Sequence, residues 1–206
     1  MKMKIFPSFI FLLTLFMILC ITGIGCEEEN DLYWEIKPDS KTSVIEIRVD
    51  GISYKFCLLN EAGEAATVFD EGENFSFYFS VTNNRNEDFY FDPDYARSNK
   101  NGFCRVHTTE NSDLGKPYEL LYALLVGSPA YPFYSGDSYV FEVPWRDDRD
   151  SVWFWQKGTY ESTHRELLEK GSYYTGFKYS FDFVGVGNEP DLRTDTLGFS
   201  INFKIR

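Results

Sequence analysis

Residues 196–206, TLGFSINFKIR, decide the fold class of this chain because apolar and polar residues alternate along them without interruption. The apolar positions share one face of an extended segment: Leu197, Phe199, Ile201, Phe203 and Ile205. The opposite face carries Thr196, Gly198, Ser200, Asn202 and Lys204. A period of two residues is typical of a strand that lies half in the core and half in solvent. Such clean alternation favours an antiparallel sheet, so we predict an antiparallel strand here.

The same alternation recurs in residues 74–83, NFSFYFSVTN, where four side chains would point inward: Phe75, Phe77, Phe79 and Val81. Further strands are predicted over residues 43–49, 52–59, 65–69, 88–91, 103–109, 118–126, 138–143, 151–155 and 173–183. Turn-forming pairs such as Asp50–Gly51 and Gly136–Asp137 separate them. Residues 118–126, YELLYALLV, could instead be helical, but their aromatic content favours a buried strand.

Strands at this spacing predict an all-β fold, specifically an antiparallel β-sandwich. One segment departs from the strand pattern, namely residues 162–171, STHRELLEKG. Thr163 and Glu166 have the spacing of a helix capping box, and Gly171 stands where a helix often ends. We therefore expect one short connecting helix over residues 164–170.

The first 25 residues have the features of a secretory signal: two lysines, no acid, and an apolar run over residues 9–21. This run is shorter than the roughly 20 residues that a membrane-spanning helix needs. The residues that follow resemble a bacterial lipobox, in which a small residue, here Gly25, precedes a cysteine that receives diacylglycerol before cleavage. The resemblance implies a lipoprotein signal peptide over residues 1–25 and lipidation of Cys26. An uncleaved signal anchor and simple secretion are the alternatives.

Residues 26–31, CEEEND, form an acidic tether in this interpretation. Runs of like charge repel one another, so Glu27–Glu29 could simply be a solvated linker. They also resemble the acidic tract that follows the lipidated cysteine in surface lipoproteins of Bacteroidetes-type bacteria. That resemblance implies an outer membrane lipoprotein exposed on the cell surface, with the periplasmic face as the alternative. The outer membrane would then be a partner through the N-terminal lipid.

Cleavage after residue 25 would leave 181 of the 206 residues, which is enough for a single β-sandwich domain over residues 32–206. It would remove two lysines and no acid, so the net charge would change from −12 to −14. Such a charge repels phosphate backbones and anionic lipids. We therefore expect no nucleic-acid partner. The 20 Phe and 14 Tyr suit a strand-rich core.

The chemistry-bearing residues show no catalytic pattern. His107 and His164 belong to none of the serine-hydrolase, zinc-protease, phosphate-loop or dinucleotide motifs. The acids of residues 147–150 lack the spacing and glycine of a calcium loop, and Arg146 and Arg149 are expected to neutralise them. We expect no enzyme activity, no cofactor and no metal site. A catalytic pair of distant carboxylates is the alternative, because such pairs need only spatial proximity.

Residues 144–155, PWRDDRDSVWFW, and 127–136, GSPAYPFYSG, carry the candidate ligand-binding side chains: Trp145, Trp153, Trp155, Tyr131, Phe133 and Tyr134. Trp153 and Trp155 would share one face of a strand, either in the core or displayed to solvent. Displayed indoles suit sugar rings or protein hot spots. The loop 127–136 could frame the same end of the sandwich as the tryptophans, or merely pack over it.

Two cysteines, Cys57 and Cys104, remain in the expected domain. Buried free cysteine is common, and no tryptophan lies between the two as it does in immunoglobulin-type bridges. We therefore predict two reduced, buried thiols. A disulfide, which needs Cα atoms about 4.4–6.8 Å apart, is the alternative.

Residues 72–92, 134–145 and 169–181 together resemble the bacterial intracellular proteinase inhibitor family. In that family a strand with an Asn-rich turn precedes a Gly-containing turn, a strand with Trp, and a Gly-x-Tyr strand. The matching residues here are Asn83, Gly136, Trp145, Gly171 and Tyr173. The resemblance implies an immunoglobulin-like sandwich and proteinase inhibition. In general character the chain also resembles Bacteroidetes surface lipoproteins with immunoglobulin-like domains.

The leading hypothesis for function is a lipid-anchored, non-enzymatic binding or adhesion module of the cell envelope. Its ligand would be a protein or a glycan. One alternative is an extracytoplasmic proteinase inhibitor, which only the family resemblance implies. Another is an accessory subunit of a surface assembly that pairs with a partner through a sheet edge.

Overall fold

The computed structural model describes residues 31–206 apart from residues 38–39, 98–99, 123–129 and 153–158. Within these ranges the chain consists of strands joined by turns, with one 3-10 helix at Asp94–Ala96. The described residues pack as one unit. No helix among them has the length and apolar character that crossing a membrane requires.

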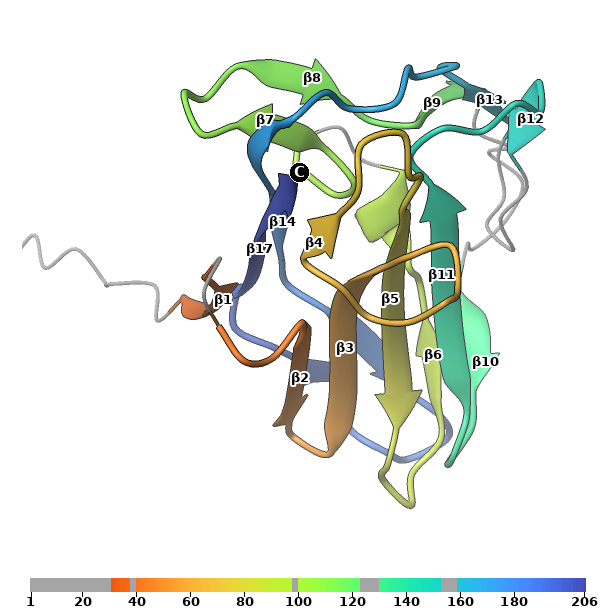
Figure 1. Cartoon of the computed structure of the whole chain (residues 1–206). Coiled ribbons are helices and arrows are strands. Elements are labelled where there is room, and N and C mark those ends of the chain that lie inside the picture. Colours follow the sequence, from red (N-terminus) through yellow and green to blue (C-terminus); the bar gives the residue numbers. More distant parts are fainter. Residues whose placement is uncertain (1–30, 38–39, 98–99, 123–129, 153–158) are drawn as a thin grey trace, which may run out of the picture. The chain divides into compact units, whose positions relative to one another are not determined.

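One main sheet is antiparallel throughout and has the strand order β11–β5–β3–β2 (Figure 1). Its strands are β2 (Val44–Val49), β3 (Ile52–Leu59), β5 (Ser76–Asn83) and β11 (Ser138–Pro144). Asp50 and Gly51 join β2 to β3 with φ values of 49° and 81°. Positive φ at both central residues is what a tight two-residue hairpin needs, which explains the Asp-Gly pair.

The second main sheet has the order β1–β17–β14–β7–β8, and β4 also pairs with β17. Its strands are β1 (Leu32–Ile36), β4 (Val68–Phe69), β7 (Val106–Thr108), β8 (Asp113–Gly115), β14 (Gly171–Tyr179) and β17 (Leu197–Ile205). Strand β17 is antiparallel to β14, whereas β1 and β4 pair with it in parallel. The predicted C-terminal strand therefore pairs with three other strands of this sheet.

Two smaller sheets complete the fold, with the orders β10–β6–β15–β16 and β12–β13–β9. Their strands are β6 (Phe89–Phe91), β9 (Tyr118–Tyr122), β10 (Tyr131–Phe133), β12 (Ser151–Val152), β13 (Thr159–Ser162), β15 (Asp182–Gly185) and β16 (Leu192–Arg193). The predicted strand over 173–183 is divided, because β14 and β15 belong to different sheets. The predicted strand over 118–126 is observed as far as Tyr122, and its remainder lies outside the described residues.

An aromatic core lies between the two main sheets. The ring of Phe56 on β3 lies 5.4 Å from that of Phe177 on β14, and the ring of Phe79 on β5 lies 5.6 Å from that of Phe199 on β17. The inward faces predicted for residues 74–83 and 196–206 are confirmed, because every apolar side chain named for them is buried. Together these contacts establish an all-β sandwich.

The predicted helix over residues 164–170 is wrong. This segment has no regular structure, and His164 has a φ of 46°. Thr163 does not cap a helix, because its hydroxyl donates to the carbonyl of Lys116 (2.7 Å) and its N–H to that of Pro117 (3.0 Å). These long-range bonds satisfy groups that a helix would otherwise use, and they override the local capping signal.

The prediction of two reduced, buried thiols is confirmed, because Cys57 and Cys104 are both buried and unbridged. Burial raises the pKa of the Cys57 thiol to about 11. It also raises the pKa of Cys104 well above its usual value. Both side chains are therefore protonated and weakly nucleophilic at neutral pH.

Candidate binding sites

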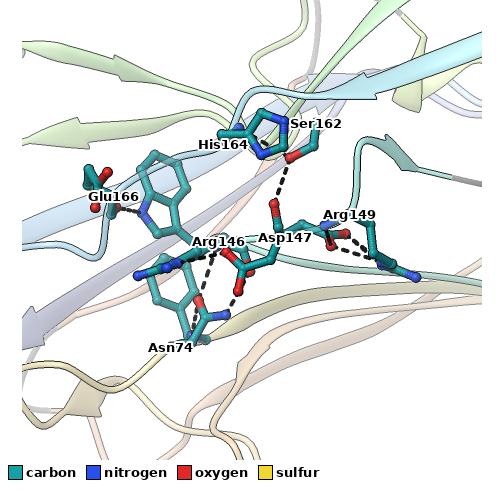
Figure 2. A network of polar contacts seen from close by, with 10 residues as sticks. Asn74, Arg146, Asp147, Arg149, Ser162, His164 and Glu166 are labelled. Carbon is teal, nitrogen blue, oxygen red and sulfur yellow. Dashed lines mark hydrogen bonds and ion pairs between the residues drawn. The ribbon is translucent and has the colours of Figure 1, made fainter.

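Trp145 follows directly after β11 and is a core residue. Its side chain is 2% exposed and its ring stacks on Phe75, with the ring centroids 6.0 Å apart. The indole Nε1 donates a 2.8 Å hydrogen bond to the carbonyl oxygen of Glu166 (Figure 2). The candidate ligand-binding residue Trp145 is therefore not displayed to solvent, because its ring completes the packing at this end of the sandwich.

A hydrogen-bond network fixes the loop after Trp145 (Figure 2). The Asn74 side chain donates to the carbonyl of Arg146 (2.8 Å) and accepts from its N–H (3.1 Å). The Ser162 hydroxyl donates to the carbonyl of Asp147 (2.9 Å) and accepts from the N–H of His164 (3.1 Å). The side chains of Asn74 and Ser162 thus hold the loop after Trp145 against two other segments of the chain.

The acidic part of this loop is neutralised by its own arginines, as predicted. Asp147 is 5% exposed and accepts hydrogen bonds from the backbone N–H and the guanidinium of Arg149. These bonds hold the pKa of the Asp147 carboxyl below its usual range. Arg146 pairs with Asp148 at 3.1 Å. Among the described residues, no three His, Cys, Asp or Glu side chains are grouped so that they could hold a metal ion.

A pocket of about 570 Å³ lies beside Trp145. The irregular segment 163–169 lines one side of it, and Leu114 and Tyr173 contribute to the remainder. The guanidinium of Arg165 lies 6.0 Å from the centre of the Trp145 ring, within the range of a cation–π contact. Arg165 also donates to the carbonyl of Lys116 at 3.0 Å, so its side chain is held in place as a wall of the pocket.

Of the other predicted binding residues, those that the structure describes do not gather around Trp145. Trp153 and Trp155 lie outside the described residues. Phe133 is buried, Tyr131 is partly buried and Tyr134 is 55% exposed.

The loop that contains Tyr134 lies at the far end of β5 from Trp145. Gly136, two residues after Tyr134, donates its N–H to the carbonyl of Asn83, whereas Trp145 donates its N–H to the carbonyl of Phe75. Asn83 ends β5, and Phe75 immediately precedes it. The described part of this loop, residues 130–136, therefore does not frame the end of the sandwich at which Trp145 lies.

A second pocket, which the sequence did not predict, lies on the outer face of the β1–β17–β14–β7 sheet. It has a volume of about 240 Å³, and we call it the outer groove. Its lining residues come from four strands and one turn: Tyr33, Asn101, His107, Tyr174, Gly176, Phe177, Lys178, Phe199 and Ser200. They are the outward positions of the alternating strands, together with the buried rings beneath them.

Lys116 is a buried cation outside both pockets. Its side chain is 3% exposed, and its Nζ has no hydrogen-bond partner among the described residues. The amine lies 4.3 Å from the centre of the Tyr118 ring. Burial lowers the pKa of this lysine to about 8. Nothing in its local sequence, LGKPY, indicates burial, although that stretch contains Tyr118, whose ring the amine contacts.

Comparisons with known proteins add no family. No family model matches this chain, and no curated protein matches it. Among solved structures, the CooA pilin subunit from enterotoxigenic Escherichia coli aligns with 72% of this chain and 98% of its own, at 11% identity. The TM-score of that alignment is 0.21, so the likeness carries no argument about the present protein.

Proposed function

We propose that this protein is a lipid-anchored binding module of the cell envelope, held to the outer membrane through Cys26. The observation that carries the proposal is the short stretch of chain between Cys26, the proposed anchor, and the first strand. Strand β1 begins at Leu32. At about 3.5 Å per extended residue, the tether would keep the sandwich within roughly 20 Å of the lipid. The acidic residues Glu27–Glu29 would then serve as the signal for surface display.

A binding role, in place of catalysis, is supported by how charged side chains are used. Asp147 is held by Arg149, and Asp113 by Arg105. The pKa values of these two carboxyls lie below their usual range, so both are poor proton donors at neutral pH. The surface offers two pockets with aromatic side chains in their linings, and such concave sites suit recognition of a small group.

The anchor is tested by metabolic labelling with radioactive palmitate in cells that express the full chain. The wild-type protein is expected to carry the label, and Cys26→Ala is expected to lose it. Cys20→Ala is the matched control and should keep the label, because Cys20 lies inside the segment that cleavage removes. Equal labelling of the wild-type protein and Cys26→Ala would overturn the anchor.

Surface display is tested by adding protease to intact cells. A surface lipoprotein is expected to be degraded while a periplasmic marker protein remains intact. Replacing Glu27–Glu29 by alanine should move the protein to the protected, periplasmic side without loss of the palmitate label. Protection of the wild-type protein would contradict surface display.

A further inference from the structure

We infer that the outer groove binds a single pyranose ring of a neutral glycan. This inference rests on the proposed binding role and names the chemical class of its ligand. The groove has a volume of about 240 Å³. Pockets for drug-sized ligands usually measure about 300–1,000 Å³, so this one suits one small ring better than an extended peptide.

Tyr33 forms one wall of the outer groove. Its side chain is 53% exposed, and its ring leans on the backbone of the neighbouring strand at Gly198. A Cβ atom at Gly198 would lie 2.4 Å from ring atom Cδ2, so the ring reaches this position only because residue 198 has no side chain. The ring therefore presents apolar surface and a hydroxyl to solvent from a supported position.

Tyr174 and His107 form the opposite wall. They pair across β14 and β7, and their rings stack with centroids 5.0 Å apart and planes 15° apart. The Tyr174 hydroxyl donates a 2.8 Å hydrogen bond to the side chain of Asn111. A ring that is already held on two sides loses little conformational entropy when a ligand binds, which favours affinity.

The floor between these walls is low and polar. Gly176 and Ser200 face each other across β14 and β17, and neither carries a bulky side chain. Among the described residues, the Ser200 hydroxyl and the ring nitrogens of His107 have no hydrogen-bond partner. Ser200 is 7% exposed and His107 is partly buried, and a hydroxyl and an imidazole can each both donate and accept, as the hydroxyl groups of a sugar require.

The charges around the groove favour a neutral ligand. Lys178 is the cation of the lining, and it is paired with Asp31. The chain as a whole carries a net charge of −12, which opposes the approach of anionic sugars or phosphates. A pyranose has apolar C–H faces and a rim of hydroxyl groups. It therefore matches a groove with aromatic walls, the Ser200 hydroxyl and His107 imidazole in its lining, and a lysine that is already paired.

The experiment uses the full chain purified in detergent and a panel of neutral methyl pyranosides: glucoside, galactoside, mannoside and N-acetylglucosaminide. Saturation-transfer NMR is expected to detect binding of at least one of them. For that sugar, Tyr33→Ala and Tyr174→Ala should each weaken the affinity about tenfold, which corresponds to about 1.4 kcal/mol. Ser200→Ala should weaken it severalfold while leaving both aromatic walls in place.

Tyr90→Ala is the matched control, because Tyr90 is an exposed tyrosine on β6 and lies outside the groove. It should bind the sugar like the wild-type protein, and all variants should keep their thermal melting temperature. Failure of every sugar to bind, or equal weakening by Tyr90→Ala, would overturn the inference. Palmitate labelling tests the lipid anchor and does not depend on sugar binding. Failure of the sugar to bind can therefore be distinguished from failure of the anchor.

Discussion

The indole N–H of Trp145 donates a 2.8 Å hydrogen bond to the backbone carbonyl of Glu166. This bond connects the end of β11 to the segment between β13 and β14. The Glu166 carbonyl oxygen therefore accepts from the indole, whereas in a helix it would accept from a backbone N–H of the next turn. The same contact therefore buries the tryptophan and helps to keep residues 164–170 out of the helix that their capping signal predicts.

Replacing Trp145 with phenylalanine should lower the free energy of unfolding by about 1–3 kcal/mol, because the Glu166 carbonyl loses its donor. Urea denaturation measures the change. Trp34→Phe is the control, because Trp34 also packs against the core, by stacking on Phe199, but forms no indole hydrogen bond within the described residues. Equal losses in the two variants would show that the hydrogen bond contributes nothing.

Replacing Phe199 with alanine should cost about 3–5 kcal/mol of stability, because large core residues leave cavities when they are truncated. Phe199 is 1% exposed, and its ring contacts those of Phe79 and Phe177. Lys204→Ala on the same strand should change stability by less than about 0.5 kcal/mol, since Lys204 is exposed. Thermal or urea unfolding tests both, and a Phe199→Ala protein as stable as wild type would contradict this packing.

The long strands could be predicted because their burial is periodic over many residues. Residues 74–83 and 196–206 each alternate through several periods, and their buried faces are the predicted ones. The short strands β8, β10 and β16 were not predicted, because two or three residues offer too few periods to recognise. Strand β1 depends on parallel pairing with β17 at the other end of the chain, which no local pattern encodes.

The candidate sites were harder to predict than the fold. The cluster of tryptophans drew attention to Trp145, but nearness in sequence does not distinguish a core indole from a displayed one. The outer groove depends on Tyr33, His107 and Tyr174, which only the sheet pairing brings together. The alternation along residues 196–206 did place Ser200 on the face opposite the core, and that was the available signal.

Thiol labelling checks the two cysteines. In the denatured, unreduced protein, Cys57 and Cys104 should both react with an alkylating reagent, because neither is bridged. In the native protein both should react slowly, since they are buried and have raised pKa values. Single variants Cys57→Ser and Cys104→Ser assign the label by mass spectrometry. Absence of labelling at both positions after denaturation would reveal a disulfide.

Replacing Lys116 with methionine should stabilise the protein at pH 7 by up to about 3 kcal/mol, since one pKa unit corresponds to about 1.4 kcal/mol. The lysine pKa falls from 10.5 to about 8 on folding, because burial penalises the charged amine. Below pH 8 both states are protonated and the penalty is complete. The contact with the Tyr118 ring offsets part of it, so the figure is an upper limit.

The pH dependence of the free energy of unfolding tests whether burial of the charged Lys116 amine destabilises the protein. Between about pH 8 and 10.5 the folded state releases the Lys116 proton before the unfolded state does, so the penalty falls and wild-type stability rises relative to Lys116→Met. Lys170→Met, at an exposed lysine, is the matched control and should follow the wild-type pH profile. Urea denaturation of the three proteins at pH 7, 8, 9 and 10 measures the differences. A stability gap between Lys116→Met and wild type that stays constant over this range would show that the buried amine does not titrate as its burial requires.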